Sequence, residues 1–562
     1  MKLLGKGHDP EFWANVRENE IFAKYRSELH EYWDKHIENY EIAALPYSKW
    51  KMFWDSGDRG EFEGEYFRRR YAFEHTFILS LVYPEENKYI NKLMDIIFAI
   101  CDEYTWCLPA HQQQNERNDN SRVDLFASET ALHLSLAYVL LGDRLDSLIR
   151  DRIRVEIDRR VISTYLGCEN YGWWEVGRSN WTAVCVGSLG CTMMLIRPEL
   201  MTEQMINRLT TAMQGYIDGF ADDGICTEGC GYWAYGVSFF VMFADMIKTY
   251  TEGKIDYFKI PKIKAIATFP QKMFLSEKAS VSFADGPTVL EYTMGVMHRL
   301  KSEYPDDVLI YSPEYGNFDI GCGRASIRLF GAIWMNEEYY LHPADNTVEF
   351  EEYAECAQWV TKRTHAYGFA AKAGHNAEMH NHNDVGSFIF AKNGQQLLMD
   401  VGAGRYTRQY FSAERYDIFE PSSRSHNVPI INGGYQYDSR EAEACDVKYE
   451  KGIFSMDISR AYKCDGLNSL RRIFTMGDES VSMLDVYDRV IGVEVVERLV
   501  SYIEPKIIST SEIAVGECVV TYDPAVCTLS IGGENDSEKG RYCYFMDFRL
   551  NADAKEFKVV MR

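Results

Sequence analysis

The sequence predicts a multidomain α+β protein in which an N-terminal (α/α) toroid of helical hairpins precedes a C-terminal domain of antiparallel β-sheets. Its 562 residues exceed what one hydrophobic core usually serves. Helical periodicity dominates up to about residue 340, and alternating runs bounded by Gly, Asn and Asp dominate after it. We therefore expect the toroid over 1–345 and the β-sheet domain over 346–562.

The helical assignment depends on the spacing of apolar residues. Residues 90–101 and 145–157 place apolar side chains every three or four positions, and 128–141 is almost wholly apolar on one side. Further helices are expected over 207–220 and 239–250. Many helices of this length suit a toroid of helical hairpins. A solenoid would show a repeat period, and the sequence shows none.

The strand assignment depends on alternating runs and on one turn signal. Asn393-Gly394 stands between two apolar runs and predicts a β-hairpin. The strands are expected over 386–391, 396–401, 480–486 and 493–501.

Composition limits the class of protein. The net charge of −24 argues against a nucleic-acid partner. No stretch approaches 18 apolar residues and the first residues lack an apolar signal segment, so no membrane is expected and a cytoplasmic location is predicted, unless a leader has been removed. Fourteen scattered Cys fit reduced thiols. The 14% aromatic share suits either large cores or sugar-binding surfaces, which stack rings on pyranose faces.

The stretch His380-Asn381-His382-Asn383-Asp384 indicates a metal site. Two histidines two residues apart face the same way in an extended strand, and Asp400 and His426 follow within 50 residues. Two imidazoles and one carboxylate form a common zinc ligand set. A strict hairpin would set Asp400 opposite Ser387, about 16 Å from His382 at ~3.3 Å per residue. The set therefore closes only if this segment curls back over the sheet.

Two other stretches carry candidate site residues. Residues 223–236 hold four glycines with two carboxylates and two tyrosines, which fits a sharply bent loop at a site or a plain turn between helices. Residues 177–181 place polar groups directly before the apolar helix expected over 182–196. Ser179 or Asn180 could simply cap that helix.

These stretches, in this order, resemble the heparinase II/III-like polysaccharide lyases. The resemblance comprises Asn180-Trp181, the 223–236 loop, the HNHND block with Asp400 and His426, and also 283–286 and 105–111, and it spans about residues 100 to 440. It implies an (α/α) toroid joined to an antiparallel β-sandwich. It also implies β-elimination of uronate-containing polymers, chiefly glycosaminoglycans such as heparan sulfate, chondroitin and hyaluronan.

The resemblance also implies roles for individual residues. Asn180 would hold the uronate carboxylate, Tyr232 would transfer the proton, and His380 would be the catalytic histidine. Tyr235 could replace Tyr232, because both flank Trp233. One divalent ion, zinc first and manganese second, is expected on His382, Asp400 and His426, with no organic cofactor. The substrate-binding residues are expected to be Trp106, His111, Arg122, Arg178, Trp181, Glu228, Trp233 and Tyr235.

The chemistry of β-elimination explains these residue types. The C5 proton of a uronate is hardly acidic while the neighbouring carboxylate is charged, so donors such as Asn180 must neutralise that carboxylate. Tyr232 can accept the C5 proton as a phenolate or donate to the leaving O4. The first role needs a lowered tyrosine pKa and a nearby cation, from Arg178, Arg122 or His380. For the epimeric uronate, His380 is the natural base.

Other functions remain open from the sequence. The substrate could be alginate or another polyuronate, and Asn180, where some relatives have a histidine, leaves the epimer preference open. A toroid glycoside hydrolase could use Asp223 and Glu228 as its two carboxylates. A non-catalytic sugar-binding protein would need only the aromatic residues.

Overall fold

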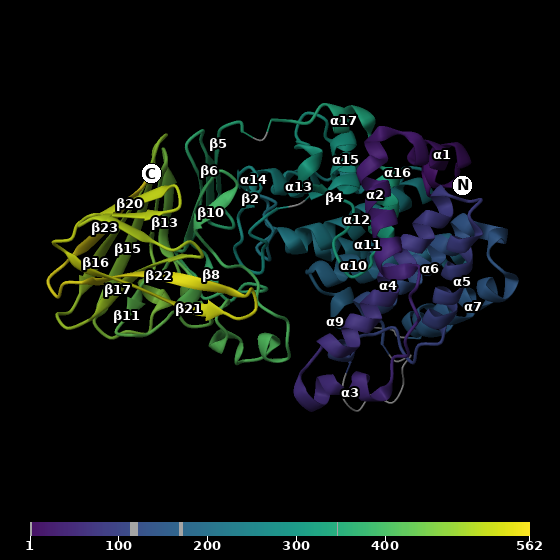
Figure 1. The fold of residues 1–562 in the computed structure, drawn as a ribbon, viewed down its shortest axis with the longest axis horizontal. Helices are drawn as coiled ribbons and strands as arrows, with labels where there is room; N and C mark the ends of the chain where they lie inside the picture. The colour runs from purple at the N-terminus through teal and green to yellow at the C-terminus, as the bar shows by residue number, and fades with distance from the viewer. Residues whose placement is uncertain (1–2, 113–121, 168–171, 291, 346) are drawn as a thin grey trace. The chain divides into compact units, whose positions relative to one another are not determined.

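The chain folds into two compact units. The computed structural model describes residues 3–112, 122–167, 172–290, 292–345 and 347–562 (Figure 1). The helical unit comprises Met1–Phe220, Ala234–Ala267 and Tyr292–Pro343. The β unit comprises Ala221–Trp233, Thr268–Glu291 and Ala344–Arg562.

The last change of unit, after Pro343, falls close to the predicted boundary at 345. Two segments expected in the helical domain, Ala221–Trp233 and Thr268–Glu291, belong instead to the β unit. The glycine-rich loop with Glu228 and Tyr232 therefore belongs to the same unit as the HNHND block.

Helices of the helical unit pack mainly on helices that are close to them along the chain. Helix α4 packs on α5, α10 packs on α6 and α11, and α16 packs on α15. All five helical stretches expected from periodicity correspond to helices of the structure, although 145–157 begins two residues before α7 and 207–220 ends one residue after α11. The helices are α1 (Pro10–Glu18), α2 (Ala23–Tyr32), α3 (Tyr47–Ser56), α4 (Gly60–Val82), α5 (Asn87–Cys101), α6 (Leu125–Leu141), α7 (Ser147–Ile157), α8 (Ser163–Leu166), α9 (Gly172–Glu175), α10 (Asn180–Ile196), α11 (Glu203–Gly219), α12 (Cys230–Tyr250), α13 (Pro261–Ala267), α15 (Met294–Glu303), α16 (Ala325–Ile333) and α17 (Glu337–Leu341).

Two helices of the described chain are long and apolar enough to cross a membrane, contrary to the expectation that no stretch would be. They span Leu125–Arg144 and Cys230–Tyr250. Buried positions make up 78% and 83% of their most apolar windows. Core helices of a folded protein pass the same test of length and hydropathy, so this finding is weak evidence for a membrane.

The β unit contains three large antiparallel sheets. One sheet has five strands in the order β10 (Gln395–Leu398), β9 (Phe388–Lys392), β7 (Gly368–Lys372), β6 (Trp359–Arg363) and β5 (Phe350–Ala354). A second has four strands in the order β11 (Ile430–Ile431), β17 (Val495–Ser501), β22 (Arg541–Leu550) and β21 (Cys527–Asp536). The third has eight strands in the order β13 (Cys445–Glu450), β14 (Ile453–Asp457), β15 (Leu467–Met476), β16 (Val481–Arg489), β23 (Glu556–Met561), β20 (Cys518–Tyr522), β19 (Glu512–Val515) and β18 (Lys506–Ser509).

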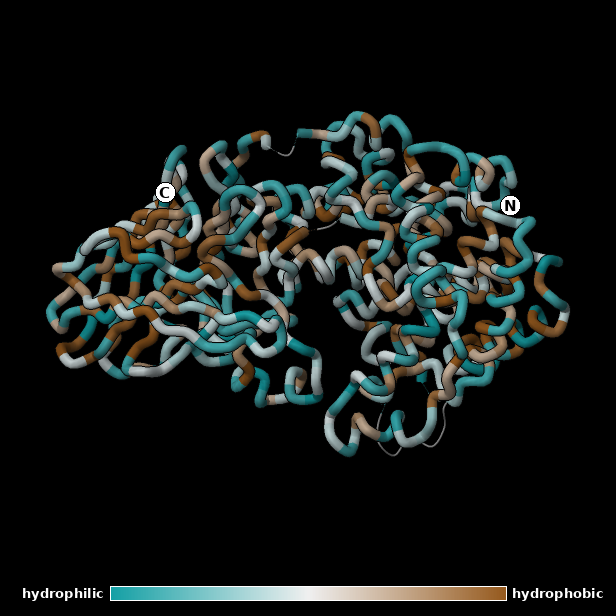
Figure 2. Tube along the Cα trace, viewed as in Figure 1, coloured by the Kyte–Doolittle hydropathy of each residue, from teal (hydrophilic) through white to brown (hydrophobic). Residues whose placement is uncertain are grey.

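One hydrophobic core joins the three sheets. Phe388 of the five-stranded sheet, Phe474 of the eight-stranded sheet and Phe548 of the four-stranded sheet are all buried in it. Apolar and polar positions alternate along many of these strands, as the colours in Figure 2 show. The β unit is therefore a sandwich of antiparallel sheets, and the predicted fold class is confirmed.

The hairpin predicted at Asn393-Gly394 is present between β9 and β10. Both residues have positive φ, at 46° and 74°, and Gln395 pairs with Lys392 directly across the turn. A bulge between Gln396 and Leu398 then shifts the register. Strand β9 begins only at Phe388, so the HNHND block precedes the strand and does not form part of it.

Candidate active site and metal centre

A single buried carboxylate, that of Asp285, organises the candidate site in the β unit. Its Oδ2 lies 2.7 Å from Nδ1 of His380 and accepts a 2.8 Å hydrogen bond from the hydroxyl of Tyr406. Its Oδ1 is surrounded by three further groups, at 3.1, 2.5 and 3.2 Å: Nε2 of His382, the hydroxyl of Tyr410 and Nη2 of Arg415. These contacts offset the burial of Asp285 and hold its carboxyl pKa well below the usual range.

Tyr232 lies directly against this cluster. Its ring stacks on His380 with centroids 3.9 Å apart, and its hydroxyl lies 2.6 Å from the hydroxyl of Tyr406. The only hydroxyl proton of Tyr406 is donated to Asp285, so the Tyr406 oxygen accepts the proton of Tyr232. Glu228 approaches the other face of the cluster, with Oε2 3.7 Å from Nε2 of His380.

The electrostatic setting keeps Tyr232 protonated. Burial raises its pKa well above the usual range, and the charges of Asp285 and Glu228 raise it further. The hydrogen bond between Tyr232 and Tyr406 and the charge of Arg415 lower the pKa, but not enough to offset these effects. The lowered tyrosine pKa that a phenolate base requires is therefore absent in this state.

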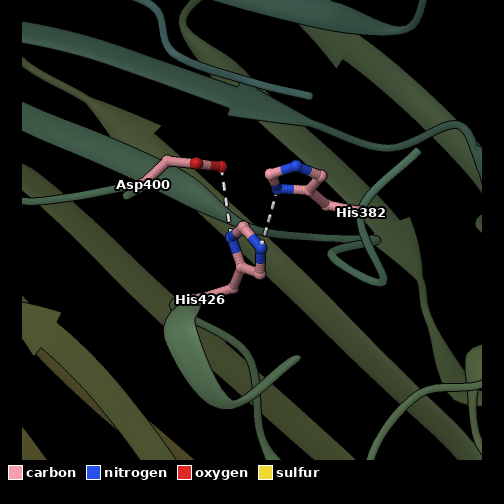
Figure 3. A group of neighbouring side chains, drawn as sticks. All are labelled: His382, Asp400 and His426. Atoms are coloured by element: carbon pink, nitrogen blue, oxygen red, sulfur yellow. Dashed lines mark hydrogen bonds and ion pairs between the residues drawn. The ribbon is translucent and has the colours of Figure 1, made fainter. Parts of the chain in front are cut away.

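His382, Asp400 and His426 form a candidate metal centre (Figure 3). One ligand atom from each lies within 4.8 Å of the other two, and all three side chains are fully buried. Nδ1 of His382 lies 3.2 Å from Nε2 of His426, and Nδ1 of His426 lies 3.1 Å from Oδ2 of Asp400. The expected curl of the chain therefore occurs, with His380 at φ 56° and Gly386 at φ 84°.

The protonation pattern of the three residues fits a bound cation. Nε2 of His382 faces the Asp285 carboxylate, which fixes the proton there and leaves Nδ1 with a lone pair. Nε2 of His426 faces the carbonyl of Glu420 at 3.1 Å, so Nδ1 of His426 presents a lone pair to the Asp400 carboxylate. Both that Nδ1 and Oδ2 of Asp400 are buried without a hydrogen bond of acceptable geometry. A divalent ion would accept these lone pairs as ligands, so the residues could hold a metal.

The sandwich core holds the loops that carry the ligands. Arg472 is fully buried, pairs with Asp485 at 2.6 Å and Glu497 at 3.0 Å, and donates to the carbonyls of Gly386 and Asn427 at 2.9 and 2.8 Å. Those carbonyls belong to the HNHND loop and to the residue after His426. The buried arginine therefore fixes both ligand loops to the sheets.

Asn180 lies in the helical unit, where it is buried as the first residue of α10. Ser179 occupies the N-cap position, yet its side chain makes no capping hydrogen bond. A Cβ added at Gly236 would lie 3.2 Å from Cβ of Asn180 and 2.6 Å from the hydroxyl of Tyr216, so only glycine allows helix α12 to approach Asn180 this closely. Capping by the Ser179 side chain therefore does not explain this motif.

Two predicted substrate-binding residues, His111 and Trp181, are in contact beside Asn180 in the helical unit. The half-buried ring of Trp181 meets the rings of His111 and Trp173, each with centroids 4.8 Å apart. Nδ1 of His111 lies 2.7 Å from Asp124, which fixes the imidazole. Arg178 is exposed and Arg122 is half-buried.

Other predicted substrate-binding residues are core residues in this structure. Trp106 is 1% exposed and its indole N–H donates to the carbonyl of Ile100, while Trp233 is 2% exposed. Neither presents a ring face to a sugar. Tyr235 donates its hydroxyl to Glu129, and Arg324 lies 4.0 Å over its ring. The alternative in which Tyr235 replaces Tyr232 is therefore disfavoured, because the Tyr235 hydroxyl is committed to a buried ion pair.

Asp285, Tyr406, Tyr410 and Arg415 are part of the site but are not among the residues predicted from the sequence. Asp285 lies in the 283–286 stretch that contributed to the family resemblance, and this was the available signal. The other three lie in a run rich in Tyr and Arg, residues 405–416, between the metal ligands Asp400 and His426. That position was the only hint of their involvement.

Comparisons with known proteins agree with this architecture. Residues 356–499 match the family model described as heparinase II/III-like, C-terminal. Over 98% of this chain and 91% of the other, the fold is similar to that of heparinase III, with a TM-score of 0.62 and 12% identity. It is also similar to a heparan sulfate lyase from Pedobacter heparinus (TM-score 0.55, 10% identity, 98% and 92% of the two chains). No curated protein matches the chain.

A third structure, a chondroitin AC lyase of Streptomyces coelicolor A3 in complex with chondroitin sulphate, has a TM-score of 0.58 and 11% identity over 98% of this chain and 82% of the other. Together these findings define the class: an (α/α) toroid with a heparinase II/III-like β-sandwich. The resemblance to heparinase II/III-like polysaccharide lyases is confirmed.

Proposed function

We propose that the protein is a polysaccharide lyase that cleaves uronate-containing glycosaminoglycans by β-elimination. The observation that carries the proposal is the stacked pair of Tyr232 and His380, held over the Asp285 carboxylate. A tyrosine that donates and a histidine whose Nδ1 is held by Asp285 supply the acid and the base that elimination needs. The named heparan sulfate and chondroitin lyases of similar fold support this substrate class.

The proposed reaction is balanced by these two side chains. His380 directs Nδ1 to Asp285, so Nε2 accepts the C5 proton of the uronate. Tyr232 is protonated and gives its hydroxyl proton to the leaving O4 as the C4–O4 bond breaks and the C4=C5 double bond forms. The side-chain amide of Asn180 donates to the uronate carboxylate and stabilises the enolate that develops.

We assign a structural role to the metal. His382, Asp400 and His426 would hold one divalent ion, with zinc preferred over manganese because two of the three ligands are imidazoles. When bound, the ion neutralises the buried Asp400 carboxylate. Asp285 contacts both His382 and His380, so the metal ligand and the catalytic histidine share one orienting carboxylate.

The hydrolase alternative loses support from the contacts of Asp223. Its Oδ2 accepts the backbone N–H groups of Cys356 and Ala357, at 2.9 and 3.0 Å, and its Oδ1 accepts that of Ile225 at 3.2 Å. These three backbone contacts occupy both carboxylate oxygens of Asp223 in holding its loop. The proposed pair of Asp223 and Glu228 is therefore incomplete.

An absorbance assay tests the proposed function. Purified protein is mixed with heparan sulfate, chondroitin sulfate, hyaluronan or alginate. A lyase creates a conjugated C4=C5 double bond, so ultraviolet absorbance should rise with at least one of the three glycosaminoglycans. Cleavage of alginate alone would move the substrate to polyuronates. New reducing ends without absorbance would identify a hydrolase, and binding without either signal a sugar-binding protein.

Asn180→Ala should lower kcat by about 100- to 1,000-fold with a KM within a few-fold of the wild type, because the amide contact strengthens as the enolate forms. Steady-state kinetics on the cleaved polymer measure both constants. Ser179→Ala is the matched control, since this neighbouring side chain makes no capping hydrogen bond. A rise in KM with an intact kcat would argue against a role of Asn180 in the chemical step.

A further inference from the structure

A cavity of about 410 Å³ lies in the helical unit, apart from Asn180 and its neighbours. Helix α3 contributes Tyr47 and Trp50 to its wall, and the segment after α5 contributes Tyr104. Its remaining wall includes Phe62, Glu103 and Thr105. This volume falls within the range of small-ligand sites, about 300–1,000 Å³.

Three aromatic rings make this cavity suited to a sugar. The rings of Tyr47 and Trp50 are stacked with centroids 6.1 Å apart, and Tyr104 meets Trp50 edge-on at 6.0 Å. Tyr47 is 72% exposed and Tyr104 is 56% exposed, so their faces are open to a ligand. Pyranose rings present an apolar C–H face that stacks on such aromatic faces.

The polar groups of the cavity favour a sugar over an apolar ligand. Nε1 of Trp50 is buried and has no hydrogen-bond partner among the residues that the structure describes, a cost that a sugar oxygen would remove. The carboxylate of Glu103 is paired with two guanidinium groups, those of Arg69 at 2.8 Å and Arg70 at 2.6 Å. These ion pairs neutralise the carboxylate that Glu103 contributes to the wall, so the cavity does not repel an acidic sugar.

Packing within the helical unit links the cavity to Asn180. Helix α3 contacts the short helix Pro109–His111. His111 meets the ring of Trp181, which follows Asn180 in the sequence. Helix α3 therefore lies next to the segment whose His111 contacts Trp181, so the cavity and the candidate catalytic amide belong to neighbouring parts of the helical unit.

We propose that this cavity is a distal subsite that binds one acidic sugar residue of the polymer, away from the bond that is cleaved. The proposal rests on the proposed lyase function. The subsite adds contacts only to substrates long enough to reach it. Its contribution is therefore to the binding of long chains and not to the chemical step.

The kinetic test compares a long and a short substrate. Trp50→Ala and Tyr104→Ala should each raise KM for heparan sulfate polymer by about tenfold, equivalent to about 1.4 kcal/mol, with kcat unchanged. KM for a heparan sulfate tetrasaccharide should stay at the wild-type value. Trp50→Phe retains a ring but removes the N–H donor and should give a smaller rise. Tyr542→Ala, at a 41% exposed tyrosine of the β unit, is the control for loss of a surface ring.

A binding test separates the subsite from the lyase activity. Calorimetric titration of Tyr232→Phe with heparan sulfate and chondroitin sulfate decasaccharides should show affinity that Trp50→Ala weakens about tenfold in the same background. Melting curves show whether each variant is folded, and the exposed loop residue Tyr104 provides a second variant should Trp50→Ala unfold. If binding depends on chain length but the wild type forms no unsaturated product, the result would support the subsite and overturn the lyase function. Active lyase with equal effects on long and short substrates, or with none, would overturn the subsite.

Discussion

A Tyr232→Phe variant should cleave polymer about 100- to 10,000-fold more slowly than the wild type, the range for losing a general acid, with KM little changed. The substitution removes one hydroxyl and keeps the ring that stacks on His380. The leaving O4 then has no proton donor, while the shape of the site is retained. Initial rates of ultraviolet absorbance give kcat and KM, and calorimetry with an oligosaccharide checks that binding survives.

Tyr235→Phe is the matched control, because it removes the same kind of hydroxyl three residues away in the same motif. Its hydroxyl donates to Glu129 beside Arg324, so its loss should cost stability, about 1–3 kcal/mol, and leave the chemical step intact. An active Tyr232→Phe together with an inactive but folded Tyr235→Phe would reverse the assignment of the two tyrosines.

His382→Ala should lose the metal and about 3–5 kcal/mol of stability together, because it removes one member of a buried charged cluster. Activity should fall as a consequence. His380→Ala should keep the metal and the melting temperature while losing activity, since the ligands His382, Asp400 and His426 remain. Elemental analysis and melting curves of both variants measure the two properties.

His365→Ala is the control for this pair, because that histidine is exposed and lies outside the cluster. A chelator should lower the melting temperature of the wild type and of His380→Ala, but not that of His382→Ala, which has no metal to lose. A full metal equivalent in His382→Ala, or its loss in His380→Ala, would contradict the separate roles of the two histidines.

Local sequence signals predicted the elements of this fold well. The period of apolar residues predicted the helices. The dipeptide Asn393-Gly394 predicted a hairpin, because both of its residues readily adopt the positive φ that the turn requires. The unit to which Ala221–Trp233 and Thr268–Glu291 belong was not predictable in this way. Their membership depends on contacts with residues more than a hundred positions away, and no local pattern records such contacts.

The site was predictable by residue type but not in its geometry. The two imidazoles and one carboxylate indicated a metal, whereas the curl that brings them together depends on backbone turns at His380 and Gly386. Asp285 became visible as the centre of the cluster only in three dimensions, since its partners lie 95–130 positions away. Trp106 and Trp233 are buried, so a tryptophan in a motif did not by itself indicate a ring that faces the substrate.

The buried Arg472 has a consequence for the order in which the β unit assembles. Its guanidinium joins strand β15 to Asp485 and Glu497 and holds the carbonyls of Gly386 and Asn427. The loops that carry His382 and His426 are therefore set in place when the sandwich core closes, before any ion arrives. We therefore expect the proposed ion to bind loops that the sheets already hold, and its removal to leave the sheets together.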